Sequence, residues 1–187
     1  RAMARPLFLG GLTVNRYLLK NSAGYILIDT GRPGSYPAFL RALGRHGLSP
    51  RHVDFVFLTH AHADYAGLLR QLLEANPSCR LLPVRSDTLS ALEVALRCRI
   101  LLTPGHTACS ISLLSDGLLF CGDAAMNGFP SQRRIPILIE NPGDFCSSWR
   151  AILRLSPKVL YPGHGRPFSP ADLARFLPWA EKMTLRP

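Results

Sequence analysis

The sequence lacks three features that would place it in a special class of protein. No apolar run approaches the ~18 residues that a membrane-spanning helix needs, and the apolar segment 7–9 is too short for a signal peptide. The five cysteines form no CxxC motif, which argues against a disulfide framework and for a reducing compartment. We therefore expect a cytoplasmic protein with no membrane segment.

Acidic residues are also scarce, but the basic residues are spread along the chain. Lys and Arg number 22 against 12 Asp and Glu, a formal net charge of +10. No basic block and no basic stripe interleaved with aromatic residues is found, so we do not expect a nucleic-acid partner. The pair Arg133 and Arg134 either faces a cleft, favouring an anionic substrate, or lies in a solvated loop, which we favour. We expect a small-molecule substrate and a monomer or homodimer.

The remaining composition is that of a compact globular domain. With 187 residues, 47% hydrophobic and 18% charged, the chain is long enough to bury a large core. No internal repeat or low-complexity linker is visible. We expect a single domain over residues 1–187.

Hydrophobic periodicity predicts a chain in which strands and helices alternate after an initial pair of strands. Strands are expected at 17–19, 25–28, 53–58, 81–84, 100–102, 111–114, 118–121 and 159–160. Helices are expected at 35–47, 66–75, 86–96, 142–155 and 170–183. In the last two helices Trp149 and Trp179 are expected to pack on a sheet. The segment 31–37 forms either a mobile flap or an ordinary turn.

The most informative segment is 59–65, THAHADY, which directly follows the apolar run 53–58. In an extended segment side chains i and i+2 point the same way, so His60 and His62 can bind one ion together, and Asp64 continues the alternation. Imidazole and carboxylate are ligand types that suit zinc, iron or manganese. The segment therefore predicts a metal site, although a solvated turn is the alternative interpretation of a histidine pair.

Three more polar side chains follow strand-like segments at turns that contain glycine. They are His106 in PGHT, Asp123 in GDA and His164 in PGHG. Glycine and proline set a tight backbone turn at a strand end, so the polar residue after them is presented at the rim of a sheet. The other two histidines, His46 and His52, are interpreted as surface residues.

The ordered set HxHxD, PGHT, GDA and PGHG resembles the metallo-β-lactamase superfamily of metal-dependent hydrolases. The segment 27–31, LIDTG, resembles the family's early strand and turn. The resemblance implies an α/β fold, an αββα sandwich of two mixed β-sheets flanked by helices. It also implies six metal ligands, namely His60, His62, Asp64, His106, Asp123 and His164.

One position departs from the family pattern, which commonly reads HxHxDH, because the last residue here is Tyr65. By the resemblance the missing histidine binds the second metal ion, which keeps Asp64, His164 and the bridging Asp123. We expect one or two Zn²⁺ ions, with Fe or Mn as alternatives at the second site. Tyr65 is expected to be a hydrogen-bonding group near the metal, or a phenolate ligand if a cation lowers its pKa from about 10.

The resemblance implies a hydrolase that uses metal-bound hydroxide on a small ester, thioester or lactone. By it, Asp64 orients the nucleophile or moves its proton, Tyr65 is a candidate donor to the oxyanion or leaving group, and Asp29 supports the site or is purely structural. Two alternatives stay open. A phosphodiesterase or nuclease of the same fold is favoured by the positive charge, and a non-catalytic metal-binding module with an eroded second site is favoured by Tyr65.

Overall fold

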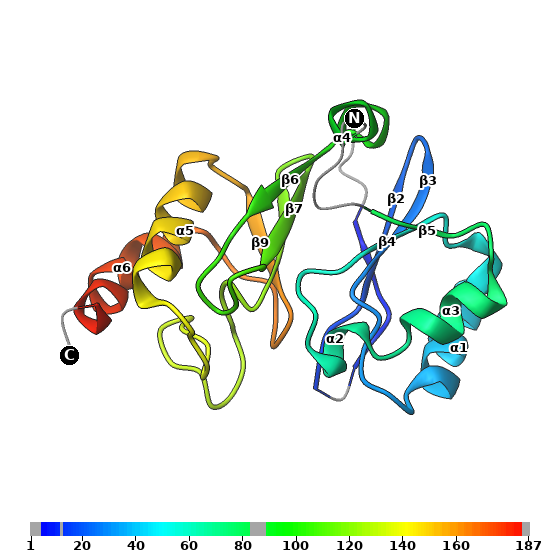
Figure 1. The fold of residues 1–187 in the computed structure, drawn as a ribbon, viewed down its shortest axis with the longest axis horizontal. Coiled ribbons are helices and arrows are strands. Elements are labelled where there is room, and N and C mark those ends of the chain that lie inside the picture. Colours follow the sequence, from blue (N-terminus) through cyan, green and yellow to red (C-terminus); the bar gives the residue numbers. More distant parts are fainter. Residues whose placement is uncertain (1–4, 12, 83–88, 185–187) are drawn as a thin grey trace. The chain divides into compact units, whose positions relative to one another are not determined.

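Two compact units make up the chain, Arg1–Arg97 and Cys98–Pro187. The computed structural model describes residues 5–11, 13–82 and 89–184. Each unit contains one mixed β-sheet and its own helices (Figure 1). Within these described ranges, no helix combines the length and the apolar character that crossing a membrane requires.

The sheet of the first unit has five strands in the order β1-β2-β3-β4-β5. Their bounds are Leu7–Phe8 (β1), Tyr17–Asn21 (β2), Gly24–Ile28 (β3), Phe55–Phe57 (β4) and Arg80–Leu81 (β5). Strands β1, β2 and β3 pair antiparallel, whereas β3, β4 and β5 run parallel. The strands predicted at 17–19, 25–28 and 53–58 are confirmed with adjusted ends. Strand β1 was not predicted, and residues 83–84 of the expected strand at 81–84 lie outside the described residues.

Two of the helices in this unit, α1 (Tyr36–Gly44) and α3 (Leu69–Ala75), cover one face of the sheet with apolar side chains. The other helices are α2 (Ala63–Ala66), α4 (Leu89–Leu96) and a 3₁₀ helix at Pro50–His52. In Figure 1, α1 and α3 lie on the same side of the sheet. Their buried side chains form a core with the sheet that includes Leu27, Phe39, Leu43, Val56 and Leu72. Residues 86–88 of the helix expected at 86–96 lie outside the described residues.

Two helix predictions in this unit are wrong in detail. Helix α1 ends at Gly44 rather than near Gly47, and its buried side chains are Phe39, Ala42 and Leu43. The helix expected over 66–75 is broken in two, since the Leu68 amide donates to Thr30 Oγ1 (3.0 Å) instead of continuing the helix. The break is therefore caused by a contact distant in sequence.

The sheet of the second unit has four strands in the order β6-β7-β8-β9. Their bounds are Cys98–Leu102, Ile111–Ser115, Leu118–Gly122 and Val159–Pro162. Asp116 and Gly117 both adopt positive φ (49° and 84°), as the predicted two-residue hairpin turn between β7 and β8 requires. Because β6 and β8 are both antiparallel to β7, and β9 is parallel to β8, strands β6, β8 and β9 run in the same direction.

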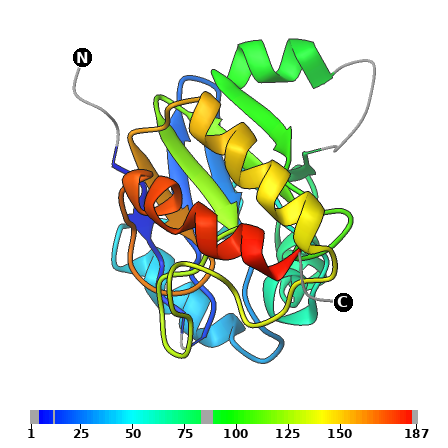
Figure 2. The same ribbon diagram turned by 90° about the vertical axis from the view of Figure 1, so that its left-hand side faces the viewer.

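Helices α5 (Pro142–Arg154) and α6 (Ala171–Met183) lie side by side over one face of this sheet (Figure 2). Helix α5 begins where the Asn141 side chain accepts a hydrogen bond from the Asp144 amide (3.0 Å). Trp149 is fully buried, so its predicted packing role is confirmed. Trp179 is 47% exposed, so its predicted packing on a sheet is wrong: the cations of Arg133 and Lys182 lie over its ring instead.

Candidate metal centre

In the first unit, two neighbouring parallel strands end at the same edge of the sheet and bring polar residues together. Strand β3 is followed by Asp29, and β4 is followed shortly by Thr59 and His60. The Asp29 amide donates to the Phe57 carbonyl (2.9 Å), which extends the pairing past the strand ends. The candidate ligands of this unit therefore follow the edge of the sheet at which β3 and β4 end.

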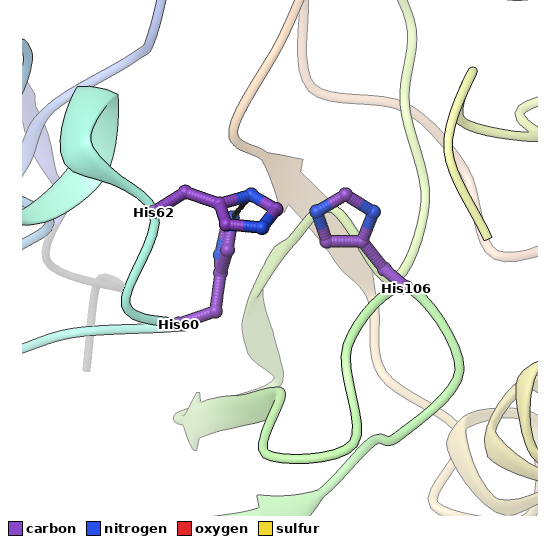
Figure 3. A group of neighbouring side chains, drawn as sticks. All are labelled: His60, His62 and His106. Atoms are coloured by element: carbon purple, nitrogen blue, oxygen red, sulfur yellow. Dashed lines mark hydrogen bonds between the residues drawn. The ribbon is translucent and has the colours of Figure 1, made fainter. Parts of the chain in front are cut away.

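His60 and His62 lie with their imidazoles in contact. His60 Nε2 is 3.1 Å from His62 Nδ1, and the rings meet edge to face with centroids 4.6 Å apart. Two nitrogens bound to one tetrahedral zinc at 2.0–2.1 Å would be roughly 3.3 Å apart. The observed spacing fits joint ligation of one ion. Figure 3 draws this pair with His106 of the second unit, and each of the three offers an imidazole nitrogen as a ligand.

A hydrogen-bonded chain orients His60. Asp29 accepts from the Thr59 amide (2.8 Å) and from Thr59 Oγ1 (3.0 Å), and Thr59 Oγ1 lies 3.1 Å from His60 Nδ1. Because the hydroxyl proton points to the carboxylate, the Thr59 oxygen accepts from His60 Nδ1–H, which leaves Nε2 with a lone pair for a metal. These contacts agree with the supporting role, one of the two alternatives considered for Asp29. The part played by Thr59 was missed, although its place directly before His60 was a signal.

Replacing Thr59 with valine is expected to weaken metal binding by about 10- to 100-fold, the usual effect of losing a partner of a metal ligand. Valine has a similar shape but cannot connect Asp29 to His60, so the imidazole loses its fixed orientation. Metal affinity measured by competition with a chelator tests this. Thr59→Ser, which keeps the hydroxyl, is the matched control and should stay near the wild-type affinity; equal losses in both variants would contradict the positioning role.

Tyr65 is fully buried, and its ring packs on the ring of His60 with centroids 3.9 Å apart. Its carbonyl oxygen accepts from the amides of Thr30 (2.7 Å) and Gly31 (3.1 Å) and from Thr30 Oγ1 (2.8 Å). These bonds hold the first residue of the segment 31–37 against Tyr65. Tyr65 therefore lies beside a candidate ligand and fixes the loop that follows Asp29.

Asp64 occupies the first turn of α2, where it is half-buried. In the part of the chain that the structure describes, no hydrogen bond or ion pair is found for its carboxylate. His46 and His52 are exposed, which confirms their assignment to the surface.

In the second unit, the three other candidate ligands follow strands that run in the same direction. His106 comes after β6, Asp123 directly after β8, and His164 after β9. The Oδ2 atom of Asp123 lies 3.5 Å from His106 Nε2 and 3.6 Å from His164 Nε2. One carboxylate oxygen therefore lies close to both imidazoles, so these three side chains could serve as metal ligands.

The PGHT turn is closely packed and fixes His106. A side chain at Gly105, where φ is 133°, would place its Cβ 2.4 Å from the Phe145 Cα, so only glycine fits there. His106 Nδ1 donates to the Leu138 carbonyl (2.7 Å), which leaves Nε2 as the atom able to bind a metal. Ser148 donates to the Pro104 carbonyl (2.7 Å) and ties the turn to α5.

None of the five cysteines forms a disulfide bond. Cys121 is buried. Burial raises the pKa of Cys79 to about 11, with a smaller contribution from Asp54, so the Cys79 thiol stays protonated at neutral pH.

Arg134 forms an ion pair with Asp172 (2.7 Å), while Arg133 stacks on the exposed Trp179 ring. Both arginines of the pair thus contact α6.

The profile of the metallo-beta-lactamase superfamily matches residues 9–87. A metallo-beta-lactamase domain-containing protein 1 from Xenopus laevis is 30% identical over 158 residues, covering 76% of this chain and 67% of the relative. The chain belongs to the metallo-β-lactamase superfamily. The sequence resemblance is confirmed.

Other metallo-β-lactamase relatives extend the comparison to the whole fold. A hydroxyacylglutathione hydrolase from Psychromonas ingrahamii is 31% identical over 70% of this chain, which spans only 59% of that relative's length. The solved structure of TTHA1623 in a di-iron-bound form is 25% identical, with a TM-score of 0.68 over 94% of this chain and 99% of that one. The predicted metallo-β-lactamase fold, two mixed sheets flanked by helices, is confirmed.

Proposed function

We propose that this metallo-β-lactamase superfamily member is a metal-dependent hydrolase of small esters, thioesters or lactones. The observation that carries the proposal is the arrangement of candidate ligands at strand ends in each unit: the His60–His62 nitrogen pair, and Asp123 close to His106 and His164. The similarity to a hydroxyacylglutathione hydrolase supports an acyl substrate. Zinc is the proposed metal, and the similarity to a di-iron protein keeps iron as the alternative.

The proposed ligand roles follow the family order. His60, His62 and His106 would hold the first ion, while Asp64, Asp123 and His164 would hold a second. A bound dication supplies hydroxide from water near neutral pH and polarises the substrate carbonyl. Thr59 and the Leu138 carbonyl keep the histidine rings oriented. Asp64, a carboxylate without a protein partner in the described residues, takes the proton of the attacking water or orients it.

Tyr65 carries a positioning role in this proposal, because its buried ring packs on His60. We propose one strong metal site and a second, weaker one. The second site is weaker because Tyr65 takes the place of a neutral nitrogen ligand.

Replacing Tyr65 with histidine is expected to raise the metal content from about one toward two ions per chain, because imidazole is a far better neutral ligand than phenol. Metal per chain, measured after dialysis against buffered zinc, checks this. Tyr65→Phe is the control: it keeps the packing on His60 and should leave the metal content unchanged. No change with histidine would show that residue 65 lies away from the second ion.

The substrate class is tested with a panel offered to the zinc-loaded protein. A thioester, a lactone and bis-p-nitrophenyl phosphate are compared, each with and without removal of the metal by a chelator. Chelator-sensitive hydrolysis of the thioester or lactone is the expected result. Hydrolysis of the phosphodiester alone would select a phosphodiesterase instead, and a metal-loaded protein inactive on all three would favour a binding module.

The partner proposed is a small molecule, and the proposed quaternary state is a monomer or homodimer. A reducing, cytoplasmic location is part of the proposal because the sequence has an odd number of cysteines and no CxxC motif.

A further inference from the structure

A cavity of about 290 Å³ opens in the first unit beside the loop that follows β3. Its volume is near the lower end of pockets that hold small molecules. Four of its lining residues are arginines, Arg16, Arg32, Arg41 and Arg45, and none is Asp or Glu. Such a concentration of uncompensated positive charge attracts anions.

Arg16 is the centre of this cavity, since it is only 3% exposed. Its Nε donates to the Gly10 carbonyl (3.1 Å), its Nη1 donates to Ser35 Oγ (3.4 Å), and its guanidinium lies over the Phe39 ring. Both acceptors are neutral. Within the described residues no carboxylate forms an ion pair with Arg16.

The charge of Arg16 persists despite this burial. Burial lowers the pKa of the guanidinium, but arginine remains protonated in proteins. A buried charge without a counter-ion is unfavourable, so an anion bound in the cavity would stabilise Arg16.

The surrounding backbone leaves room for the Arg16 side chain and holds its acceptor Ser35 in place. A Cβ at Gly31 would lie 3.1 Å from Arg16 Cδ, so glycine there admits the arginine stem. Ser35 Oγ donates to the Arg32 carbonyl (2.8 Å), which turns its oxygen toward Arg16.

Helix α1 begins beside the cavity. Its N-cap, Ser35, makes no side-chain capping bond, and no acidic residue lies in its first turn, so the positive end of the helix dipole is not neutralised. Ala38 and Arg41 lie three residues apart on α1, Arg45 follows directly after the end of the helix, and all three line the cavity.

We propose that this cavity binds the phosphate group of a small molecule, with Arg16 as the buried donor and Arg41 and Arg45 at the rim. Several N–H donors from different elements suit the oxygens of a phosphate, and arginine is the preferred residue for such recognition. The proposal does not rest on the metal ligands or on hydrolysis, because every residue that carries it lies outside the candidate metal centre.

Titration calorimetry with inorganic phosphate, replacing chloride at constant ionic strength, tests the proposal. We expect one phosphate per chain. The double variant Arg41→Ala/Arg45→Ala should lower the affinity by about 10-fold or more, as loss of charged hydrogen bonds predicts. Arg70→Ala/Arg80→Ala is the matched control, since both are exposed arginines of the same unit outside the cavity, and it should stay within about 2-fold.

Arg16→Met separates binding from a merely structural role. It should abolish phosphate binding while the thermal midpoint stays the same or rises, because an uncompensated buried charge is removed. The rim variants decide the question even where Arg16→Met does not fold. Absence of saturable phosphate binding, equal losses in the two double variants, or tighter binding of acetate than of phosphate would overturn the proposal.

Discussion

Replacing His62 with alanine is expected to remove the metal from the first site and, with it, hydrolysis. The imidazole of His62 meets that of His60 at a spacing suited to one ion, and alanine offers no donor. Loss of the partner of a ligand already costs 10- to 100-fold in affinity or activity, so loss of a ligand itself should cost about 100-fold or more. Metal per chain and hydrolysis rate are measured on the same preparation.

His46→Ala is the matched control for this experiment. His46 is exposed, carries no proposed role and belongs to the same unit. It should retain the wild-type metal content and rate. A His62→Ala protein that hydrolyses its substrate without metal would contradict the proposed mechanism.

Replacing Trp149 with alanine is expected to lower the free energy of unfolding by about 3–5 kcal/mol, as for other fully buried aromatic residues. Trp149 packs on Phe145 with ring centroids 5.0 Å apart, and its Nε1–H donates to the Ala124 carbonyl (2.6 Å). Ala124 directly follows Asp123, so the indole also holds the end of β8 where a candidate ligand begins. For a chain of this length the midpoint of thermal unfolding should fall by on the order of 10 °C.

Trp179→Ala provides the matched comparison on the neighbouring helix. Because Trp179 is about half exposed, its loss should change stability by less than about 1 kcal/mol. Thermal unfolding followed by circular dichroism measures both variants. Similar losses in the two would mean that the buried indole is not the packing anchor of α5.

Local sequence patterns predicted most elements because each pattern depends on neighbouring residues. Asp116 and Gly117 suit the positive φ that a tight hairpin needs, and Asn141 followed by Pro142 starts a helix. The break before α3 could not be predicted, since it depends on Thr30, a residue 38 positions away in the chain. The outward position of Trp179 likewise depends on which stripe of α6 meets the sheet.

The candidate site likewise contains residues that local patterns predicted and residues whose contacts depend on distant parts of the chain. His60 and His62 were identified by spacing alone, and the glycine turns marked His106 and His164. The sequence does not reveal that Thr59 connects Asp29 to His60, because β3 and β4 become neighbours only in the sheet. The arginines of the cavity look scattered in the sequence for a similar reason: three separate segments bring them together.

The metal content per chain, measured by elemental mass spectrometry on protein purified without chelator or metal-affinity tag, tests the central claim most directly. The proposed ligand set predicts one or two equivalents of zinc or iron per chain. A chain that stays empty after zinc, iron and manganese have each been offered would contradict both the metal centre and the hydrolase proposed from it.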